Sequence, residues 1–282
     1  MSGTAVLLTH SHPPGAAEAV EVACRVAGEA GWDLVATAEE VGKHEGRPSG
    51  LREVTELPQD PDLCLVLGGD GTILRALRLY AGAGVPVFAV NYGTMGFLAA
   101  VEREEAEQGI RRAFQGDFDV VGLPALEVRW DGEAVVGLND ISFTRRPHGR
   151  VAELTYRIAG QEVGHVRCDG LVAATPAGST GYNLANNGPI LAWGVEGYVV
   201  SYIAPHSLTA RALVVAPGDV LQVANAAGRD AVDVAVDGAP VGALEPGEEV
   251  EIRFRDGVGR LAQLPGTSFY GRIREKFGHL AV

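Results

Sequence analysis

The sequence predicts a doubly wound α/β domain followed by a β-sandwich domain, with a C-terminal helix that packs back on the first domain. Two observations indicate this fold class. Before residue 117, short apolar runs alternate with amphipathic helical segments, which is typical of a parallel sheet with helices on its faces. After it, short β-rich runs follow one another with turn residues between them. We therefore expect an α/β domain over 1–117, completed by a helix over 266–282, and a β-rich domain over 118–265.

The first domain contains four apolar runs that predict buried strands, at 4–10, 33–37, 62–67 and 85–91. Helices are expected at 15–32, 72–83 and 102–116, where apolar residues recur at helical spacing. Residues 39–58 are polar and contain glycine, so we expect a loop or lid with a little helix there. This alternation predicts a Rossmann-like order of strands and helices.

The second domain is expected to be all β. Its β-rich runs lie at 125–130, 134–145, 153–160, 161–166, 170–176, 212–223, 231–238 and 249–257. In the tail, Phe269, Ile273 and Phe277 recur at helical spacing, so we expect the chain to end in a helix.

The composition excludes several classes of protein. The chain has 282 residues and a net charge of −13, which argues against binding to nucleic acid or to an anionic membrane, because both need a basic surface. There is no secretory leader at Met1 and no apolar run long enough to cross a membrane, so we expect a cytoplasmic protein. Cys24, Cys64 and Cys168 are odd in number and lack C-x-x-C spacing, which predicts buried thiols rather than a disulfide or zinc site.

The segment 63–77, LCLVLGGDGTILRAL, has the pattern of a strand, a glycine turn and a helix. Gly68, Gly69 and Gly71 allow the backbone to approach a ligand closely, and the following helix N-terminus attracts anions. The only lysines are Lys43 and Lys276, and neither stands in a G-x-x-x-x-G-K-[ST] loop, so a P-loop is excluded.

Asp70 in this turn would repel a phosphate unless it has another task. It could hold a metal ion, accept a hydrogen bond from a hydroxyl, or take the proton of an attacking hydroxyl, and all three tasks suggest phosphoryl transfer. The alternative is that Asp70 merely caps the helix that begins at Thr72. The turn by itself leaves both interpretations open.

The wider set of motifs resembles the NAD kinases. GGDGT (68–72) is shared with the diacylglycerol and sphingosine type lipid kinases and, more loosely, with the phosphofructokinases. The motifs that resemble NAD kinases specifically are NYGTMGFLA (91–99), LND (138–140), RCDGLVAATPAGSTGYNLANNGPI (167–190), APHSLTARALVV (204–215) and FYGRIREKF (269–277). They stand in the family's order over nearly the whole chain.

The resemblance implies transfer of the terminal phosphoryl group of ATP to the 2'-hydroxyl of the adenosine ribose of NAD, which gives NADP. Asp70 is then the general base for this hydroxyl, and Gly68, Gly69, Gly71 and Thr72 contact phosphates. Mg²⁺ or another divalent cation would bridge the phosphate oxygens, without a dedicated set of protein ligands. The family also implies a homodimer or homotetramer, because a neighbouring subunit completes part of the site.

The resemblance assigns the dinucleotide site mostly to the second domain. The implied NAD-binding residues are Phe97, Asn139, Asp140, Arg167, Asp169, Thr175, Ala177, Thr180, Gly181, Tyr182 and Ala185. Three of them depart from the family pattern: Asp140 stands in place of Glu, Gly181 in place of the commoner Ala, and Ala185 where many members have a Ser. We expect the shorter acid and the missing hydroxyl to change the affinity for NAD rather than the type of reaction.

Several of these residues have ordinary structural alternatives. Phe97 could be a core residue instead of a wall against the adenine. Asn139 and Asp140 could form an Asx turn, and Asp169 with its following glycine a hairpin turn. Tyr182 could be a half-buried tyrosine of the β domain.

Other polar residues near the motifs are given a structural or solvated role. His10 and His12 follow the first strand without a third metal ligand, and His206 lies inside a family motif. Arg145 and Arg146 could contact phosphates, but a solvated loop is the default.

The sequence leaves two other functions open. A lipid kinase would share GGDGT, although no amphipathic or basic membrane-facing stretch is visible. A nucleotide-binding regulator could keep the fold without turnover, but a pure binder has no need for Asp70 beside incoming phosphates.

Overall fold

The computed structural model describes residues 3–10, 16–44, 48–94, 96–226 and 230–279. The chain forms two compact units: unit 1 comprises 1–122 and 259–282, and unit 2 comprises 123–258. The sequence pattern placed the corresponding boundaries after residues 117 and 265. Within the described ranges, no helix combines the length and the apolar character needed to cross a bilayer.

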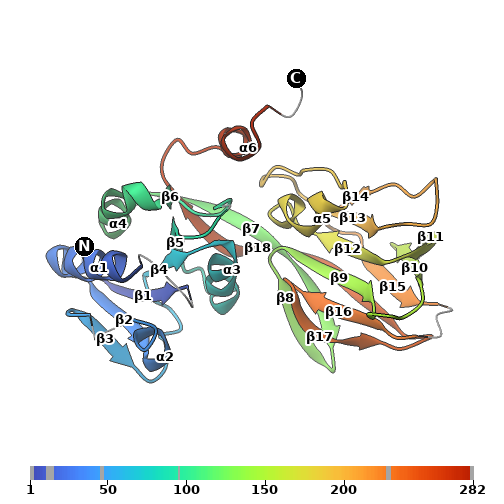
Figure 1. Cartoon of the computed structure of the whole chain (residues 1–282), viewed down its shortest axis with the longest axis horizontal. Coiled ribbons are helices and arrows are strands. Elements are labelled where there is room, and N and C mark those ends of the chain that lie inside the picture. The colour runs from blue at the N-terminus through green and yellow to red at the C-terminus, as the bar shows by residue number, and fades with distance from the viewer. Residues whose placement is uncertain (1–2, 11–15, 45–47, 95, 227–229, 280–282) are drawn as a thin grey trace. The chain divides into compact units, whose positions relative to one another are not determined.

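Unit 1 contains a parallel sheet (Figure 1). Its strands are β1 (Thr4–Thr9), β2 (Asp33–Thr37), β3 (Leu51–Val54), β4 (Leu63–Gly68), β5 (Val87–Asn91) and the short β6 (Val101–Glu102). The order β3-β2-β1-β4-β5 reverses direction between β1 and β4, as in a doubly wound sheet, which confirms the predicted fold class of this unit. Ligands of such sheets bind outside the carboxyl ends of the strands at this reversal.

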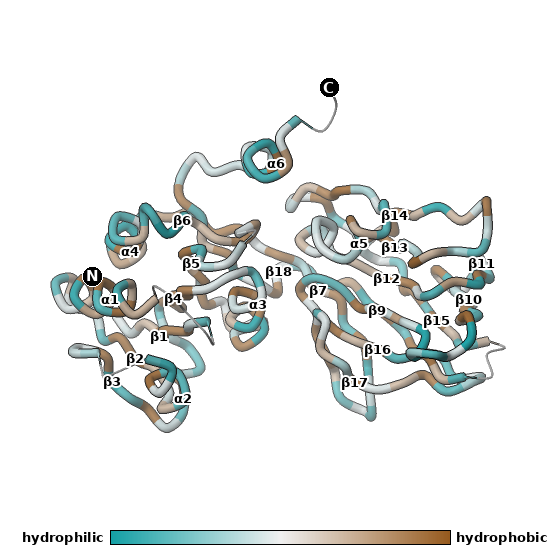
Figure 2. The backbone as a smooth tube through the Cα atoms, in the orientation of Figure 1, coloured by the Kyte–Doolittle hydropathy of each residue, from teal (hydrophilic) through white to brown (hydrophobic). Residues whose placement is uncertain are grey.

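The helices of unit 1 are α1 (Ala16–Ala30), α2 (Ala38–Val41), α3 (Asp70–Leu79), the 3₁₀ turn η1 (Arg103–Glu105) and α4 (Ala106–Gln115). The buried face of α1 consists of small residues such as Ala23 and Ala27, so α1 and α4 pack closely, with the rings of Trp32 and Phe114 5.3 Å apart. α4 ends at Gly116, whose φ of +73° is easily adopted only by glycine. Figure 2 shows the contrast between hydrophobic β5 and hydrophilic α4.

The C-terminal helix α6 (Phe269–Phe277) belongs to unit 1, as expected from its apolar spacing. Its N-cap is Ser268, whose Oγ accepts a hydrogen bond from the Gly271 N–H at 3.0 Å. Its first and last residues pack on Phe97, with ring centroids 6.0 Å (Phe269) and 5.9 Å (Phe277) from it. The helix therefore packs back on the α/β unit.

Unit 2 is an antiparallel β-sandwich. One sheet has the order β14-β13-β12-β9-β16-β17, and the facing strands are β11-β10-β15-β18 together with β7 and β8. The core contains side chains from both sheets, for example Leu154 and Val223 from one and Phe143 and Leu171 from the other. The elements are β7 (Asp119–Trp130), β8 (Glu133–Gly137), β9 (Asp140–Arg145), β10 (Ala152–Ile158), β11 (Gln161–Cys168), β12 (Gly170–Ala174), η2 (Gly178–Thr180), α5 (Tyr182–Ala185), β13 (Tyr198–Ile203), β14 (Leu213–Val215), β15 (Leu221–Asn225), β16 (Val232–Val236), β17 (Ala239–Leu244) and β18 (Glu249–Gln263).

Four strands lie outside the predicted runs, namely β3, the two-residue β6, β13 and β17. β3 falls in the segment expected to be a loop or lid, and only Leu51 of its four residues is buried, which is why its pattern does not read as a strand. β13 and β17 were not predicted as separate strands. The three cysteines are all free and buried, as predicted.

Candidate active site

The GGDGT turn joins β4 to α3, with Gly69 as the N-cap and Asp70 as the first helical residue. The turn lies directly against the loop after β5: a Cβ on Gly93 would come within 2.7 Å of the Gly69 Cα. On its other side, a Cβ on Gly68 would come within 2.7 Å of the Thr72 hydroxyl. Gly69 and Gly93 are therefore needed for this close backbone contact, and Gly68 leaves room for the Thr72 side chain, whether or not a ligand is bound.

Asp70 fixes the same loop by hydrogen bonds. Its Oδ2 accepts the Phe97 N–H and its Oδ1 accepts the Leu98 N–H, both at 3.0 Å. Each carboxylate oxygen keeps further acceptor capacity, because an ionised carboxylate has about four lone-pair sites. The side chain is half-buried and held in one orientation.

A pocket of about 270 Å³ lies at the carboxyl ends of β1 and β4, where the strand order reverses. Ligand sites are expected at this place in a doubly wound sheet. Three side chains that line it are basic or titratable, namely His10, Lys43 and Arg75. The remaining lining residues are Thr9, Gly69, Gly71, Thr72 and Gly93.

Buried Glu40 organises the two cations of this pocket. Its carboxylate accepts hydrogen bonds from Lys43 Nζ at 2.7 Å, from the Thr9 N–H at 2.9 Å and from Arg75. Burial alone would raise the pKa of Glu40, but Lys43, the Thr9 N–H and the charge of Arg75 together hold it below its usual 4.5. One carboxylate between two cations leaves a net positive charge, which suits an anionic ligand.

In unit 2, the Asn139–Asp140 pair lies in a turn that is hydrogen-bonded to two other segments. The Leu138 carbonyl accepts the Thr175 hydroxyl at 2.6 Å, and the Asn139 carbonyl accepts the Thr175 N–H at 2.8 Å. Gly178 packs so tightly on the Asn139 backbone that no side chain fits there. The structure thus brings Asn139, Asp140 and Thr175 together.

Asp140 is buried beside a second carboxylate. Burial, followed by the negative charge of Asp237, raises the pKa of Asp140 from 3.8 to about 7. Burial and then the charges of Asp140 and Asp169 raise the pKa of the Tyr182 hydroxyl, so these two acids lie near the tyrosine. Tyr182 is 39% exposed, so its ring is open to a ligand.

The arginines near this cluster form ion pairs. Arg145 Nε donates to Asp169 Oδ1 at 2.6 Å, and Arg146 pairs with Asp233 at 2.8 Å. Arg167 Nε lies 3.2 Å from a carboxylate oxygen of Glu153. Arg145 is therefore not merely solvated, because it holds the carboxylate of Asp169.

Within the 175–185 segment, Ser179 and Thr180 donate hydrogen bonds to nearby backbone carbonyls. Ser179 is buried and bonds to the Pro176 carbonyl at 2.7 Å, and the Thr180 hydroxyl donates to the Ala177 carbonyl at 3.1 Å. Ala177 is also buried, whereas Gly181 is the N-cap and Ala185 the last residue of the short helix α5.

Phe97 is 5% exposed and packs against Phe269 and Phe277, which is the arrangement of a core side chain. His10 lines the pocket at β1, and His206 is exposed. His12 lies outside the described residues.

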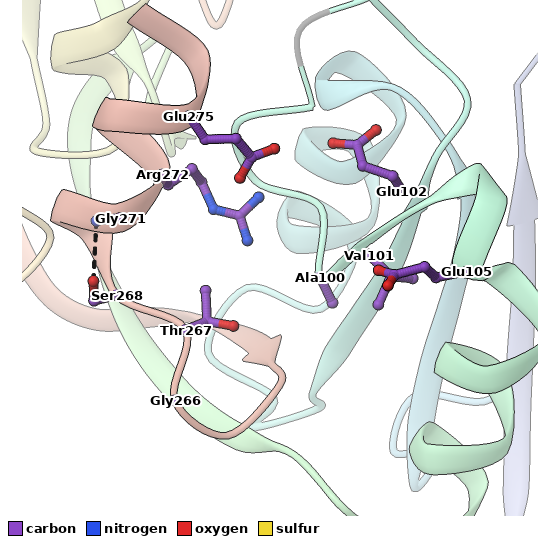
Figure 3. A pocket seen from close by; sticks show the side chains of 10 residues that line it. All are labelled: Ala100, Val101, Glu102, Glu105, Gly266, Thr267, Ser268, Gly271, Arg272 and Glu275. Carbon is purple, nitrogen blue, oxygen red and sulfur yellow. Dashed lines mark hydrogen bonds between the residues drawn. The ribbon is translucent and has the colours of Figure 1, made fainter. Parts of the chain in front are cut away.

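Arg272 of α6 contacts the loop that Asp70 holds, although the sequence pattern did not single it out. It is buried, it donates to the Gly96 carbonyl at 3.1 Å and to Gln263 Oε1 at 2.6 Å, and its pKa is lowered by burial despite the nearby charges of Glu275 and Asp70. Figure 3 shows its guanidinium reaching from α6 into a pocket of about 490 Å³. Nothing in its local pattern marks it, because the bonded partners are far away in sequence.

The described residues contain no group of three or more His, Cys, Asp or Glu side chains arranged to hold a metal ion. A divalent ion that arrives on nucleotide phosphates needs only one or two carboxylates from the protein. Asp70 at the pocket turn is compatible with that requirement.

Comparison with known protein families gives two matches. Residues 20–118 match the ATP-NAD kinase N-terminal domain, and residues 138–260 match the ATP-NAD kinase C-terminal domain. An NAD kinase of Symbiobacterium thermophilum is 36% identical over 221 residues, which cover 76% of this chain and 78% of that protein. An NAD kinase of Carboxydothermus hydrogenoformans is 33% identical over 231 residues, covering 80% and 82%.

Solved structures have the same fold. The yeast NADH kinase complexed with NADH superposes with a TM-score of 0.85 at 22% identity, covering 99% of this chain and 88% of that one. The NAD kinase from Archaeoglobus fulgidus in complex with ATP gives a TM-score of 0.70 at 22% identity, covering 99% and 98%. The comparisons favour neither a lipid kinase nor a regulator without turnover.

Proposed function

The chain belongs to the ATP-NAD kinase family, and from this premise we propose that it transfers the terminal phosphoryl group of ATP to the 2'-hydroxyl of the adenosine ribose of NAD, forming NADP. ATP and NAD are its substrates. The pocket between the ends of β1 and β4, with Asp70 in the adjoining turn, is the feature of this chain that best supports the proposal.

The donor phosphates bind in this pocket. Its position at the strand-order reversal, the N-terminus of α3 and the net positive charge of the Glu40, Lys43 and Arg75 cluster all favour a phosphate. Lys43 and Arg75 supply charge that the GGDGT turn lacks, because the only side-chain charge in the turn is that of Asp70.

Asp70 acts as the general base. As the 2'-oxygen of the ribose forms its bond to the terminal phosphorus, the proton of that hydroxyl passes to the Asp70 carboxylate, and the bond from phosphorus to the bridging oxygen breaks to release ADP. The Phe97 and Leu98 N–H groups keep the carboxylate in a fixed orientation, so it loses little rotamer freedom on binding the hydroxyl.

Unit 2 supplies residues that bind NAD. We assign the adenosine and its ribose to Asn139 and Asp140, with an ionised Asp140 accepting ribose hydroxyl hydrogen bonds. Tyr182 offers a ring for stacking. The other proposed contacts are Arg167, Asp169, Thr175, Ala177, Thr180, Gly181 and Ala185.

Mg²⁺ entering with ATP would be held by the donor phosphates, and when bound it would neutralise charge on the phosphate oxygens. We also propose a cytoplasmic homodimer or homotetramer. Exposed apolar side chains on unit 2 support association: Leu208 is 95% exposed, and Val163, Leu213 and Val214 are also exposed.

A coupled assay tests the function. Purified protein is incubated with NAD, ATP and Mg²⁺, and NADP is detected with a dehydrogenase that accepts only NADP. We expect NADP formation that stops when a chelator removes the ion. Binding of NAD by calorimetry with no NADP from ATP or polyphosphate would instead support a regulator without turnover.

A further inference from the structure

Within the described parts of the chain, three β-hairpins close with two-residue turns in which both residues have positive φ. They are Asp131–Gly132 between β7 and β8 (φ 49° and 84°), Ala159–Gly160 between β10 and β11 (50° and 77°), and Asp237–Gly238 between β16 and β17 (47° and 75°). Such turns match the twist of the flanking strands and favour Asn, Asp or Gly at the first position. Ala159 shows that this fold does not need an acid there.

The Asp237 side chain does something that the turn itself does not require. Its Oδ1 accepts the N–H groups of Asn139 at 2.7 Å and Asp140 at 3.1 Å, and its Oδ2 accepts the N–H of Leu138 at 3.0 Å. The Asp237 N–H in turn donates to the Asp140 carbonyl at 2.9 Å. Four hydrogen bonds therefore join the hairpin turn to the Asn139–Asp140 turn.

Close packing on both sides fixes the position of the Asn139–Asp140 turn against the Asp237 turn. A Cβ on Gly137 would come within 3.0 Å of the Asp140 carbonyl and 3.2 Å of Asp237 Oδ1, so only glycine lets the two turns approach in this way. On its other side, the Asn139 backbone is bonded to Thr175 and covered by Gly178. Residues 138–140 are thus held between the 175–178 segment and the Asp237 carboxylate.

We propose that Asp237 is a positioning residue of the dinucleotide site, whose carboxylate fixes the backbone of Asn139 and Asp140 in the conformation that binds NAD. This inference rests on the proposed function, because it takes Asn139 and Asp140 as NAD contacts. Asp237 need not touch NAD itself. It acts through the backbone N–H groups of Leu138, Asn139 and Asp140, which donate to its carboxylate.

The charge of Asp237 has a second consequence. The titratable groups that face Asp140 are Asp237 from the hairpin turn and Tyr182 from α5, and within the described chain Asp140 has no ion-pair partner. Asp237 therefore adds to burial in favouring the protonated form of Asp140. Because the ionised form is the better acceptor for ribose hydroxyls, NAD affinity should rise with pH through the range near 7.

Two variants separate the roles of the charge and of the contact. Asp237→Asn removes the charge but keeps an oxygen that can accept from Asn139 and Asp140. Asp237→Gly removes the whole contact and still permits a positive φ. The matched controls are Asp131→Asn and Asp131→Gly, because Asp131 occupies the same turn position in the β7–β8 hairpin and is exposed.

The measurement is NAD affinity by calorimetry from pH 6 to 8.5, with KM for NAD and for ATP and a thermal melt for each variant. We expect Asp237→Gly to weaken NAD binding roughly tenfold with KM for ATP unchanged, because the backbone N–H groups of residues 138–140 lose their acceptor. We expect Asp237→Asn to shift the midpoint of the pH dependence to lower pH. The Asp131 variants should change neither the NAD affinity nor the midpoint of its pH dependence.

The proposal would be overturned if both Asp237 variants bound NAD as tightly as the natural protein and showed the same midpoint of the pH dependence. So would equal losses in the Asp131 and Asp237 variants, because the turn alone would then be responsible. A natural protein that binds NAD but forms no NADP would contradict the proposed reaction, while the comparison of NAD affinities would still test Asp237.

Discussion

The carboxylate of Asp70 accepts the backbone N–H of Phe97 at 3.0 Å, so the acid of the GGDGT turn and the loop after β5 hold each other in place. The same loop is bonded through its Gly96 carbonyl to Arg272 of α6 at 3.1 Å. A chain of direct contacts therefore runs from the C-terminal helix to the proposed general base, entirely within unit 1.

We predict that Arg272→Gln lowers kcat about tenfold with a smaller effect on both KM values, because the loop that orients Asp70 loses a charged hydrogen bond. Steady-state kinetics measures this directly. Arg274→Gln, on the exposed side of the same helix, is the control and should match the natural protein. Equal effects of both variants would show that Arg272 matters only for the stability of α6.

Lys43→Met and Arg75→Gln should each raise KM for ATP roughly tenfold and leave KM for NAD unchanged, because a charge-assisted hydrogen bond to phosphate contributes about 1.5–3 kcal/mol. Initial rates against both substrates test this. Arg52→Gln, whose partner is Asp33 on the adjacent β2, serves as the control. A rise in KM for NAD instead would place the nicotinamide dinucleotide, not the donor, in this pocket.

Gly93→Ala should reduce activity by at least tenfold and lower stability by about 1–3 kcal/mol, because the new Cβ would meet backbone rather than a movable side chain. The Cβ position lies 2.7 Å from the Gly69 Cα, so the GGDGT turn must shift. Gly28→Ala, on the exposed side of α1, is the matched substitution, since nothing lies within 4 Å of its Cβ position. Urea unfolding and the coupled assay distinguish the two variants.

Asp140→Asn should stabilise the fold at pH 8 and weaken NAD binding. The native state binds a proton on Asp140 that the unfolded chain releases between pH 3.8 and about 7, so the free energy of unfolding falls as pH rises through this range. Since one pKa unit corresponds to about 1.4 kcal/mol, removing the carboxylate should add up to roughly 4 kcal/mol at pH 8 and nothing at pH 3. Thermal melts at the two pH values check the sign. A destabilised variant at pH 8 would mean that the ionised form has a favourable partner.

Much of unit 1 could be predicted from the sequence, because its central strands are buried on both faces and read as continuous apolar runs. β4 and β5 are entirely buried, and the glycines that follow β4 mark the turn to α3. β3 escaped prediction because Arg52 and Glu53 make it a polar edge strand. Its place beside β2 depends on parallel pairing, which leaves no trace in local sequence.

Site residues could be predicted from the sequence only where they belong to a recognisable motif. The grouping of Asn139, Asp140 and Thr175 followed from the family resemblance, but the contacts of Asp237 and Arg272 join residues that are 97 and 176 positions apart from their partners. An Asp-Gly pair in a hairpin looks the same at 131 and at 237, so no local pattern distinguishes the turn that binds another segment. The cationic pocket likewise needs α2 and α3 to be placed beside β1 before it can be recognised.

The most direct test of the account is the rate of NADP formation by Asp70→Asn, measured together with NAD and ATP binding by calorimetry. We predict a loss of roughly two to four orders of magnitude in rate, the usual contribution of a general base, with both substrates still bound. A rate within tenfold of that of the natural protein would contradict the assignment of Asp70 as the base. Loss of NAD binding along with the rate would make Asp70 a residue that holds the 96–98 loop or a metal ion rather than one that takes the proton.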